Sequence, residues 1–239
     1  MIIKNKVCLS VVIFLVFVVA LSVNAEVGTE KLELSLRWRG IVGGKSIINS
    51  KEILMSDFGQ NAYLFEAELK TVALADILFK IKNEYSTLVI NDSGYILPIW
   101  WKVKQREKKY KYEEKTDFAE LPENEANLQN PLSALFFLRL QDWEVGKSVT
   151  VPVLERKKVY PVKVTALSKE SLKIYGKTFD TILLDVAISS VDLGISSAKI
   201  KEFKIWLTND DKKFPILMKA ETSVGPITVL LDNRKDLMK

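Results

Sequence analysis

Apolar and polar side chains alternate with a period of two through most of this sequence, and no other feature limits the possible folds so strongly. Between residues 31 and 42, every second residue from Leu32 to Trp38 is apolar, and the residues between them are charged or polar. This spacing places the apolar side chains on one face of an extended strand. Further strands are predicted at 46–56, 62–70, 86–90, 95–104, 148–154, 157–166, 171–175, 179–188, 200–207, 215–222 and 226–232. The pattern predicts an all-β fold.

Two segments have helical spacing instead. In the segment 72–85, apolar residues recur at the intervals that form one stripe on a helix. This stripe consists of Leu74, Ile77, Leu78 and Ile81. In the second segment, Asn130 can cap a helix and Pro131 suits its first position, so a helix is predicted from residue 131. A polar loop at 121–130 precedes this helix, and we expect two short helices in all.

The first 25 residues have the features of a secretory signal peptide. Lys4 and Lys6 supply positive charge, and an apolar run covers 7–23. The short segment after this run ends at Ala25, a small residue that suits cleavage. We therefore expect export to the periplasm. The alternative is that the run 7–23 remains as an anchor in the inner membrane, since it is just long enough to span a bilayer.

Composition restricts the chemistry of the mature chain, residues 26–239, which we expect to form one domain. The whole sequence is 48% apolar and 27% charged, which is typical of a globular protein. It contains no histidine, and Cys8 in the signal segment is its only cysteine. The mature chain therefore has no disulfide, thiolate nucleophile, histidine base or Cys/His zinc site. Without Lys4 and Lys6, the 35 basic residues fall to 33 against 30 acidic ones, too small an excess to indicate a nucleic-acid partner.

The stretch 205–217, IWLTNDDKKFPIL, contains two adjacent carboxylates and two adjacent amines between apolar segments. Asn and Asp favour turns because their side chains bond to the nearby backbone. We therefore expect Asp210 and Asp211 to lie at the tip of a hairpin and to face water. A catalytic or metal-binding role for this pair is the alternative.

Four motifs in the same order resemble those of an exported family, domain of unknown function 3108. The motifs are WRGIVGG at 38–44, NPLSALFFLR at 130–139, WEVG at 143–146, and IWLTNDDKKFPIL at 205–217 with the later GPITVLL at 225–231. Asn130 stands where the family has Asp. Trp100 and Trp101 stand where smaller or aliphatic residues are expected.

The resemblance implies an architecture similar to that of Lol-type lipoprotein carriers. In such proteins a strongly curved antiparallel sheet forms an incomplete β-barrel that short helices close. The family has no established activity, so the resemblance implies no catalytic residue and no cofactor.

Binding of an apolar ligand, such as a lipid or a lipoprotein acyl chain, is the first functional hypothesis. A half-barrel has an open mouth, and barrel mouths commonly hold ligands. Trp38, Trp101, Phe136 and Phe137 are candidates to line such a cavity. The alternative is that all four are ordinary core residues, since large aromatic side chains are common in cores.

A cell-envelope interaction protein without a small ligand is the second hypothesis. The segment from Lys102 to Lys115 is rich in lysine and arginine and is expected to form a hairpin arm. It is a candidate for contact with a membrane surface or a protein partner, although charged runs usually just face water.

An enzyme is not expected. The acid pairs Glu113-Glu114 and Asp210-Asp211 are the candidates for a hydrolase, but both lie in polar segments where a raised pKa is not expected.

Overall fold

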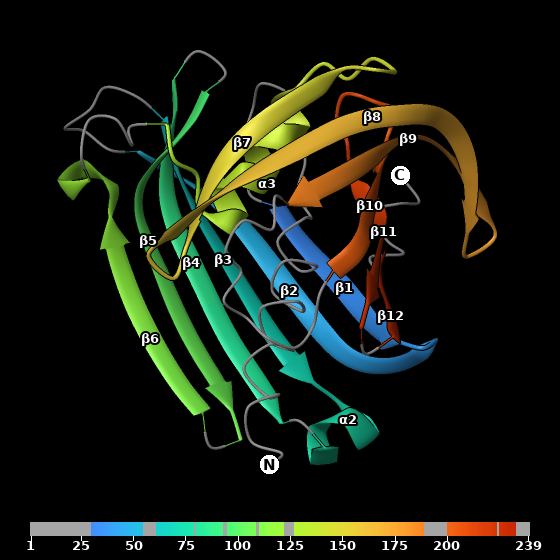
Figure 1. The fold of residues 1–239 in the computed structure, drawn as a ribbon, viewed down its shortest axis with the longest axis horizontal. Coiled ribbons are helices and arrows are strands. Elements are labelled where there is room, and N and C mark those ends of the chain that lie inside the picture. Colours follow the sequence, from blue (N-terminus) through green and yellow to red (C-terminus); the bar gives the residue numbers. More distant parts are fainter. Residues whose placement is uncertain are drawn as a thin grey trace.

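Twelve strands form one antiparallel sheet in the computed structural model, which describes residues 30–54, 61–78, 80–92, 95–108, 110–121, 127–188, 200–223 and 225–232 (Figure 1). The strands are β1 Glu30–Trp38, β2 Ile41–Leu54, β3 Asn61–Thr71, β4 Ile81–Asp92, β5 Tyr95–Glu107, β6 Tyr110–Asp117, β7 Ser148–Glu155, β8 Lys158–Ile174, β9 Lys177–Ile188, β10 Ile200–Thr208, β11 Pro215–Thr222 and β12 Gly225–Leu231. The helices are α2 Ala73–Leu78, the 3-10 helix η2 Phe118–Glu120 and α3 Pro131–Leu140. The predicted signal segment 1–25 and residues 122–126 of the predicted loop 121–130 lie outside the described residues.

The order of strands in the sheet follows from two meanders. The chain starts at β1 and moves outward strand by strand to β6, which forms one edge. The connection that contains α3 then crosses to β7 at the other edge, and the chain returns inward to β12. β12 pairs with β1, so the two halves share one continuous sheet. Every hydrogen-bonded pair of strands is therefore also consecutive in sequence, except the central pair of β12 and β1.

The sheet curls into an incomplete barrel, as the resemblance implied (Figure 1). Apolar residues at every second position face the inside: on β3, Tyr63, Phe65 and Leu69 are buried while Glu66 is exposed. Such alternation holds because successive side chains of a strand point to opposite faces. Within the described residues no ladder of hydrogen bonds joins β6 to β7, so the barrel is not closed.

The segment 128–130 bridges the two edges of the sheet. The Gln129 backbone N–H donates to the Pro152 carbonyl at 2.9 Å, and the Leu154 N–H donates to the Gln129 carbonyl at 2.7 Å. The Gln129 side chain donates to the Ile96 carbonyl of β5 at 2.8 Å. One residue thus bonds both to β7 and to the opposite half of the sheet. We call the line along which β5 and β6 face β7 the seam.

α3 lies inside the curve of the sheet and packs on β4, β5 and β7 (Figure 1). Its start agrees with the sequence prediction, because the Asn130 side chain accepts hydrogen bonds from the backbone N–H groups of Leu132 and Ser133, at 3.0 and 2.9 Å. Ser133 completes a capping box by accepting from the Asn130 N–H. Almost the whole helix is buried, so it fills the interior next to the seam. No helix among the described residues is long and apolar enough to cross a membrane.

The predicted helix at 72–85 is wrong at its C-terminal end. α2 covers only Ala73–Leu78, and Ile81 begins β4. Ile81 fits the helical stripe by spacing, but in the structure it is buried in the sheet, where β4 pairs with both β3 and β5. Hydrogen bonding to strands on both sides outweighs a stripe of four apolar residues, three of which are exposed in α2.

The remaining predicted strands are present in the structure, but β2 and β4 each begin five residues earlier than predicted, residues 55–56 lie outside the described residues, and two predicted strands merge. The segments 157–166 and 171–175 form the single strand β8, with a register shift between Ala166 and Ser168. The stretch 205–217 is a hairpin tip between β10 and β11 as expected. There the Asp210 carboxylate accepts from the Thr208 hydroxyl at 2.6 Å and from the Lys213 N–H at 2.9 Å, so it stabilises the turn.

Candidate functional site

A cleft of about 340 Å³ opens at the seam. One wall comes from β6 and η2, including Glu114, Asp117 and Glu120. The other wall comes from the β7–β8 hairpin, through Leu154 and Lys157. The cleft therefore exists because the barrel is incomplete, and its lining is mixed in charge.

Glu155 lies beside this cleft and is the most unusual acid of the described chain. It follows Val151 and Val153 at the two-residue spacing of β7, so it faces the inside, and only 4% of its surface is exposed. Burial raises the pKa of the Glu155 carboxyl to about 8, although Arg156 lowers it. Glu114 adds to the increase as a second negative charge nearby.

Arg156 connects the cleft to the interior. Its guanidinium lies over the rings of Tyr110 and Tyr112, 5.9 and 5.1 Å from their centroids. It also donates a hydrogen bond to the side-chain oxygen Oε1 of Gln105, and the side-chain N–H at Nε2 of Gln105 donates to the Tyr85 hydroxyl at 3.3 Å. The turn between β7 and β8 thus reaches across the seam to β4, β5 and β6.

Glu114 supplies the second carboxylate of this cluster. Glu114 is half-buried, and its carboxylate accepts a hydrogen bond from the Tyr112 hydroxyl. We call the six residues Tyr85, Gln105, Tyr112, Glu114, Glu155 and Arg156 the seam cluster. Five of the six lie on β4, β5, β6 and β7, and Arg156 lies in the turn after β7, so the cluster exists only when the sheet curls.

The hydrogen bonding of the seam cluster is incomplete within the described residues. Both carboxylate oxygens of Glu155 accept no hydrogen bond there, and Nε of Arg156 donates none. The two groups form an ion pair with 3.7 Å between Arg156 Nε and Glu155 Oε1, which is too long for a hydrogen bond. A buried polar atom is costly unless a protein group, a water, an ion or a ligand satisfies its hydrogen bonding. The cluster could bind a polar group that both accepts and donates hydrogen bonds.

The four aromatic residues predicted to line a cavity are distributed along the interior. Trp101 is buried and stacks on Tyr85 of the seam cluster, with 5.9 Å between ring centroids. Phe136 is buried in α3 and stacks on Phe65 of β3. Phe137 and Trp38 are half-buried and pack against the core. None of the four lines the cleft at the seam, so a role in ligand contact stays a prediction.

The two acid pairs from the sequence behave differently from each other. Asp210 and Asp211 are both exposed at the hairpin tip. Glu113 is exposed on β6, whereas Glu114 faces inward and joins the seam cluster. The arm from Lys102 to Lys115 is the hairpin of β5 and β6, as expected.

Sequence reasoning missed Glu155, Arg156 and Gln105. One signal was available: Glu155 continues the alternation of Val149, Val151 and Val153, which predicts an inward-facing acid. Arg156 and Gln105 carried no such signal, because nothing in the sequence indicates that the β7–β8 turn approaches β5.

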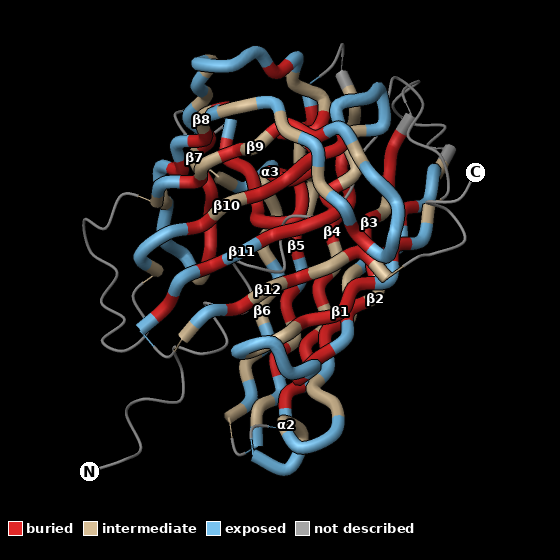
Figure 2. The backbone as a smooth tube through the Cα atoms, turned by 90° about the vertical axis from the view of Figure 1, so that its right-hand side faces the viewer, coloured by how far each residue is buried: buried red, intermediate tan, exposed pale blue. Residues whose placement is uncertain are grey.

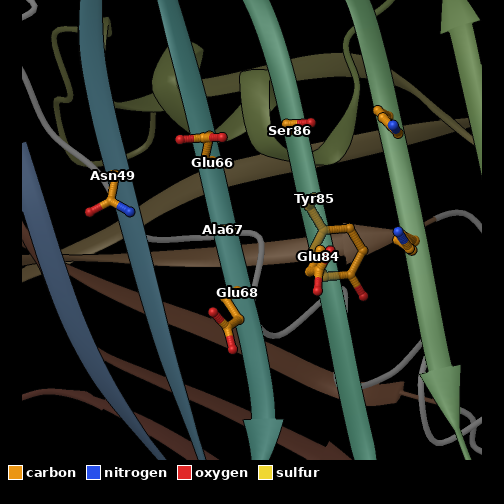
Figure 3. A pocket seen from close by; sticks show the side chains of 9 residues that line it. Asn49, Glu66, Ala67, Glu68, Glu84, Tyr85 and Ser86 are labelled. Carbon is orange, nitrogen blue, oxygen red and sulfur yellow. The ribbon is translucent and has the colours of Figure 1, made fainter.

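A second cleft, of about 360 Å³, lies on the outer face of β2 to β5 (Figure 3). Its lining includes Glu66 and Glu68 of β3 and Glu84 of β4, with Lys102 and Lys104 of β5 beside them. These side chains are exposed or half-buried, and Glu84 sits opposite Lys104 in the β4–β5 ladder. The outer cleft therefore resembles an ordinary solvated sheet face with alternating charges.

Arg139 is a second buried cation, on α3. Its side chain is fully buried, donates to the Lys212 carbonyl at 3.1 Å and lies 3.9 Å from the Glu30 carboxylate. Burial lowers its pKa well below the ordinary value, whereas Glu30 and Asp210 raise it. The Phe136 and Phe214 rings flank it. Arg139 thus attaches α3 to the β10–β11 tip, a structural role.

Comparison with known families decides the classification. The sequence matches the family described as "Protein of unknown function (DUF3108)" over residues 33–232. The chain belongs to the DUF3108 family. The membership confirms the resemblance drawn from the four motifs, and the DUF3108 region includes all twelve strands except the first residues of β1.

A beta-barrel-like protein of domain of unknown function DUF1849 from Brucella abortus is among the solved structures that are similar to this DUF3108 chain. The identity is 9%, the TM-score is 0.44, and the match covers 85% of this chain and 95% of the other. A comparison with curated proteins found no match.

Proposed function

We propose that this DUF3108 protein is an exported, periplasmic binding protein for an amphipathic ligand such as a lipid or a lipoprotein acyl chain. The polar end of the ligand would bind at the seam cluster, and its apolar part would lie against Leu121, Leu154 and Val159, which line the cleft. The observation that carries the proposal is the buried Glu155 carboxyl next to the partly buried Arg156 guanidinium beside an open cleft, with its hydrogen bonding incomplete among the described residues.

Charge and polarity support an amphipathic ligand rather than a purely apolar one. A buried carboxyl and a guanidinium together suit a group that carries both a donor and an acceptor, as lipid headgroups do. The neighbouring interior is apolar: Trp101 and Val103 on β5 are both almost fully buried. Export is supported by the charged and apolar pattern of the first 25 residues.

We also propose a binding role rather than a catalytic one. The mature chain offers no histidine or cysteine for proton transfer or nucleophilic attack. The raised pKa of the buried Glu155 carboxyl suits the role of a general acid. A hydrolase based on two carboxyl groups would therefore have to use Glu155 together with Glu114. A hydrolase would release a product from its substrate, whereas a carrier would return its ligand unchanged.

Native mass spectrometry tests this proposal. The protein is purified from an envelope fraction and its mass is measured before and after extraction with organic solvent. We expect a co-purifying amphipathic molecule at close to one per chain, and its mass identifies the ligand class. The Arg156→Met variant should lose the ligand, while Arg106→Met, an exposed arginine on β5, should keep it.

Two outcomes would overturn the proposal. One is a wild-type protein that carries no ligand and takes up neither added phospholipid nor a fluorescent fatty acid. The other is equal ligand occupancy in Arg156→Met and wild type. Circular dichroism of each variant separates loss of binding from loss of the fold.

A further inference from the structure

Half of the ten large apolar side chains that are clearly exposed in the described chain gather at one end of the sheet. They are Ile41 (70% exposed), Val42 (37%), Leu74 (64%), Ile77 (75%) and Leu78 (49%). Figure 2 shows this end as the narrow, mostly exposed tip around α2. We call these five residues the α2 patch. Single exposed apolar residues are normal on protein surfaces, but a cluster of this kind marks an interaction site.

The fold holds the two parts of the α2 patch together. The Val72 N–H donates to the Gly43 carbonyl at 3.0 Å, so the start of α2 lies on the start of β2. A Cβ atom at Gly43 would come within 3.3 Å of Ala75 Cβ, which shows how closely the helix approaches the strand. The Thr71 hydroxyl donates to the Asp76 carboxylate at 2.8 Å. These contacts fix α2 in place, so the exposure of its apolar side chains is built into the fold.

Positive charge surrounds the α2 patch. Lys45 and Lys70 are exposed and lie opposite each other on β2 and β3. Lys80 follows α2, and Lys108 lies in the β5–β6 turn at the same end, where its backbone N–H donates to the Lys80 carbonyl at 3.2 Å. None of these four lysines forms an ion pair within the described residues. The collar of lysines is therefore available to an anionic partner.

Two carboxylates of the described residues lie at this end, Asp76 on α2 and Glu107 at the end of β5, so they offset only part of the charge of the four lysines. The carboxylate of Asp76 is engaged by Thr71 at the base of α2. The Asn83 side chain donates to Glu107 at 3.5 Å. An apolar tip inside a basic collar is complementary to a bilayer that contains anionic lipid, because apolar side chains enter the interface while lysines meet the phosphates.

We propose that the α2 end of the protein docks onto the surface of an anionic lipid bilayer. The α2 patch inserts among the headgroups, and Lys45, Lys70, Lys80 and Lys108 bind the phosphates. A protein partner fits less well, since a stable protein interface covers about 800 Å² and some 20–30 residues on each side. A second copy of the chain would bring two sets of lysines together, and their positive charges would repel each other. The docking surface is distinct from the seam cluster and does not depend on a ligand there.

Vesicle sedimentation tests the docking surface. The probes are vesicles of phosphatidylglycerol and phosphatidylcholine in equal amounts, and vesicles of phosphatidylcholine alone. The mass of the purified protein is measured first, because an uncleaved segment 1–25 would bind vesicles by itself. We expect binding to the anionic vesicles that weakens as salt is added.

The matched variants are Ile77→Ser in the α2 patch and Val145→Ser, a 57% exposed residue in the connection between α3 and β7. Ile77→Ser should bind anionic vesicles roughly tenfold or more weakly, since it removes one inserted apolar side chain. Val145→Ser should bind like wild type. Both residues are exposed, so thermal unfolding should be unchanged in both variants.

Three results would overturn the proposal: no binding of the mature protein to anionic vesicles, equal binding by Ile77→Ser and Val145→Ser, or equal binding to both kinds of vesicle. If Ile77→Ser instead abolishes a dimer seen by sedimentation, the α2 patch is a protein interface. Ligand occupancy at the seam is unaffected by Ile77→Ser, so the two proposals fail separately.

Discussion

Replacing Glu155 with glutamine should change how the stability of this protein depends on pH. In the unfolded chain the Glu155 carboxyl has its ordinary pKa of 4.5, and in the folded protein burial raises this pKa to about 8. Between these two values the folded state holds one proton more than the unfolded state. The free energy of unfolding of the wild type therefore falls as pH rises through this window.

The size of this effect follows from the two pKa values. Each pH unit between them removes about 1.4 kcal/mol of stability. The full contribution is present below pH 4.5, and about 5 kcal/mol is lost by pH 8. Glutamine stays neutral in both states, so Glu155→Gln lacks this loss. The variant should thus gain stability relative to wild type as pH rises, and the gain should level off above pH 8.

Urea unfolding followed by tryptophan fluorescence, at intervals between pH 5 and pH 9, measures this difference. Subtracting the wild type from the variant removes the contributions of all other titrating groups. Glu144→Gln, at an exposed position before β7, serves as the control for removing one carboxylate and should follow the wild-type profile.

Two results would refute the reasoning about Glu155. A difference between variant and wild type that does not change with pH would show that burial does not affect the Glu155 carboxyl. A variant that becomes relatively less stable as pH rises would show that Arg156 stabilises the ionised carboxylate more than burial disfavours it.

Two further changes test the interior next to the seam. Asn130→Ala should lower the free energy of unfolding by about 2 kcal/mol, because it removes the two hydrogen bonds that cap α3 and leaves buried donors unpaired; Asn127→Ala, exposed on the same segment, should be nearly neutral in urea unfolding. Phe136→Ala should cost about 3–5 kcal/mol, since it leaves a cavity against β3, and the same substitution at the half-buried Phe137 should cost less when both are compared by urea unfolding. Equal losses at 136 and 137 would contradict the packing of α3.

Most of the strands could be predicted from the sequence because strand geometry is a local property. The period of two on β1, β3 and β7 assigns each side chain to a face, whatever the partner strand. The start of α3 was also predictable, since Asn130 and Pro131 act within one helical turn. The predicted helix at 72–85 extended too far because Ile81 fits both spacings. Only pairing with β3 and β5 assigns Ile81 to a strand.

The candidate site was predictable only in part. The inward direction of Glu155 follows from the alternation of β7, but its partners do not. Arg156 donates a hydrogen bond to Gln105, which lies 51 positions earlier in the sequence. The Arg156 guanidinium also lies over the rings of Tyr110 and Tyr112 on the other side of the seam. These contacts require the curl of the whole sheet. The four aromatic residues chosen from the sequence are apolar and large, which indicates burial but not which space they border.

The sequence by itself determined most of the strands, the start of α3, the absence of histidine and cysteine from residues 26–239, and membership of the DUF3108 family. Local backbone geometry and composition are enough for these conclusions. The tertiary structure alone decided that β6 and β7 face each other across an open seam, that a buried carboxyl and a partly buried guanidinium meet there, and that the apolar residues of α2 face outward. Burial and its electrostatic effects depend on every neighbouring strand, so they appear only when the sheet has curled.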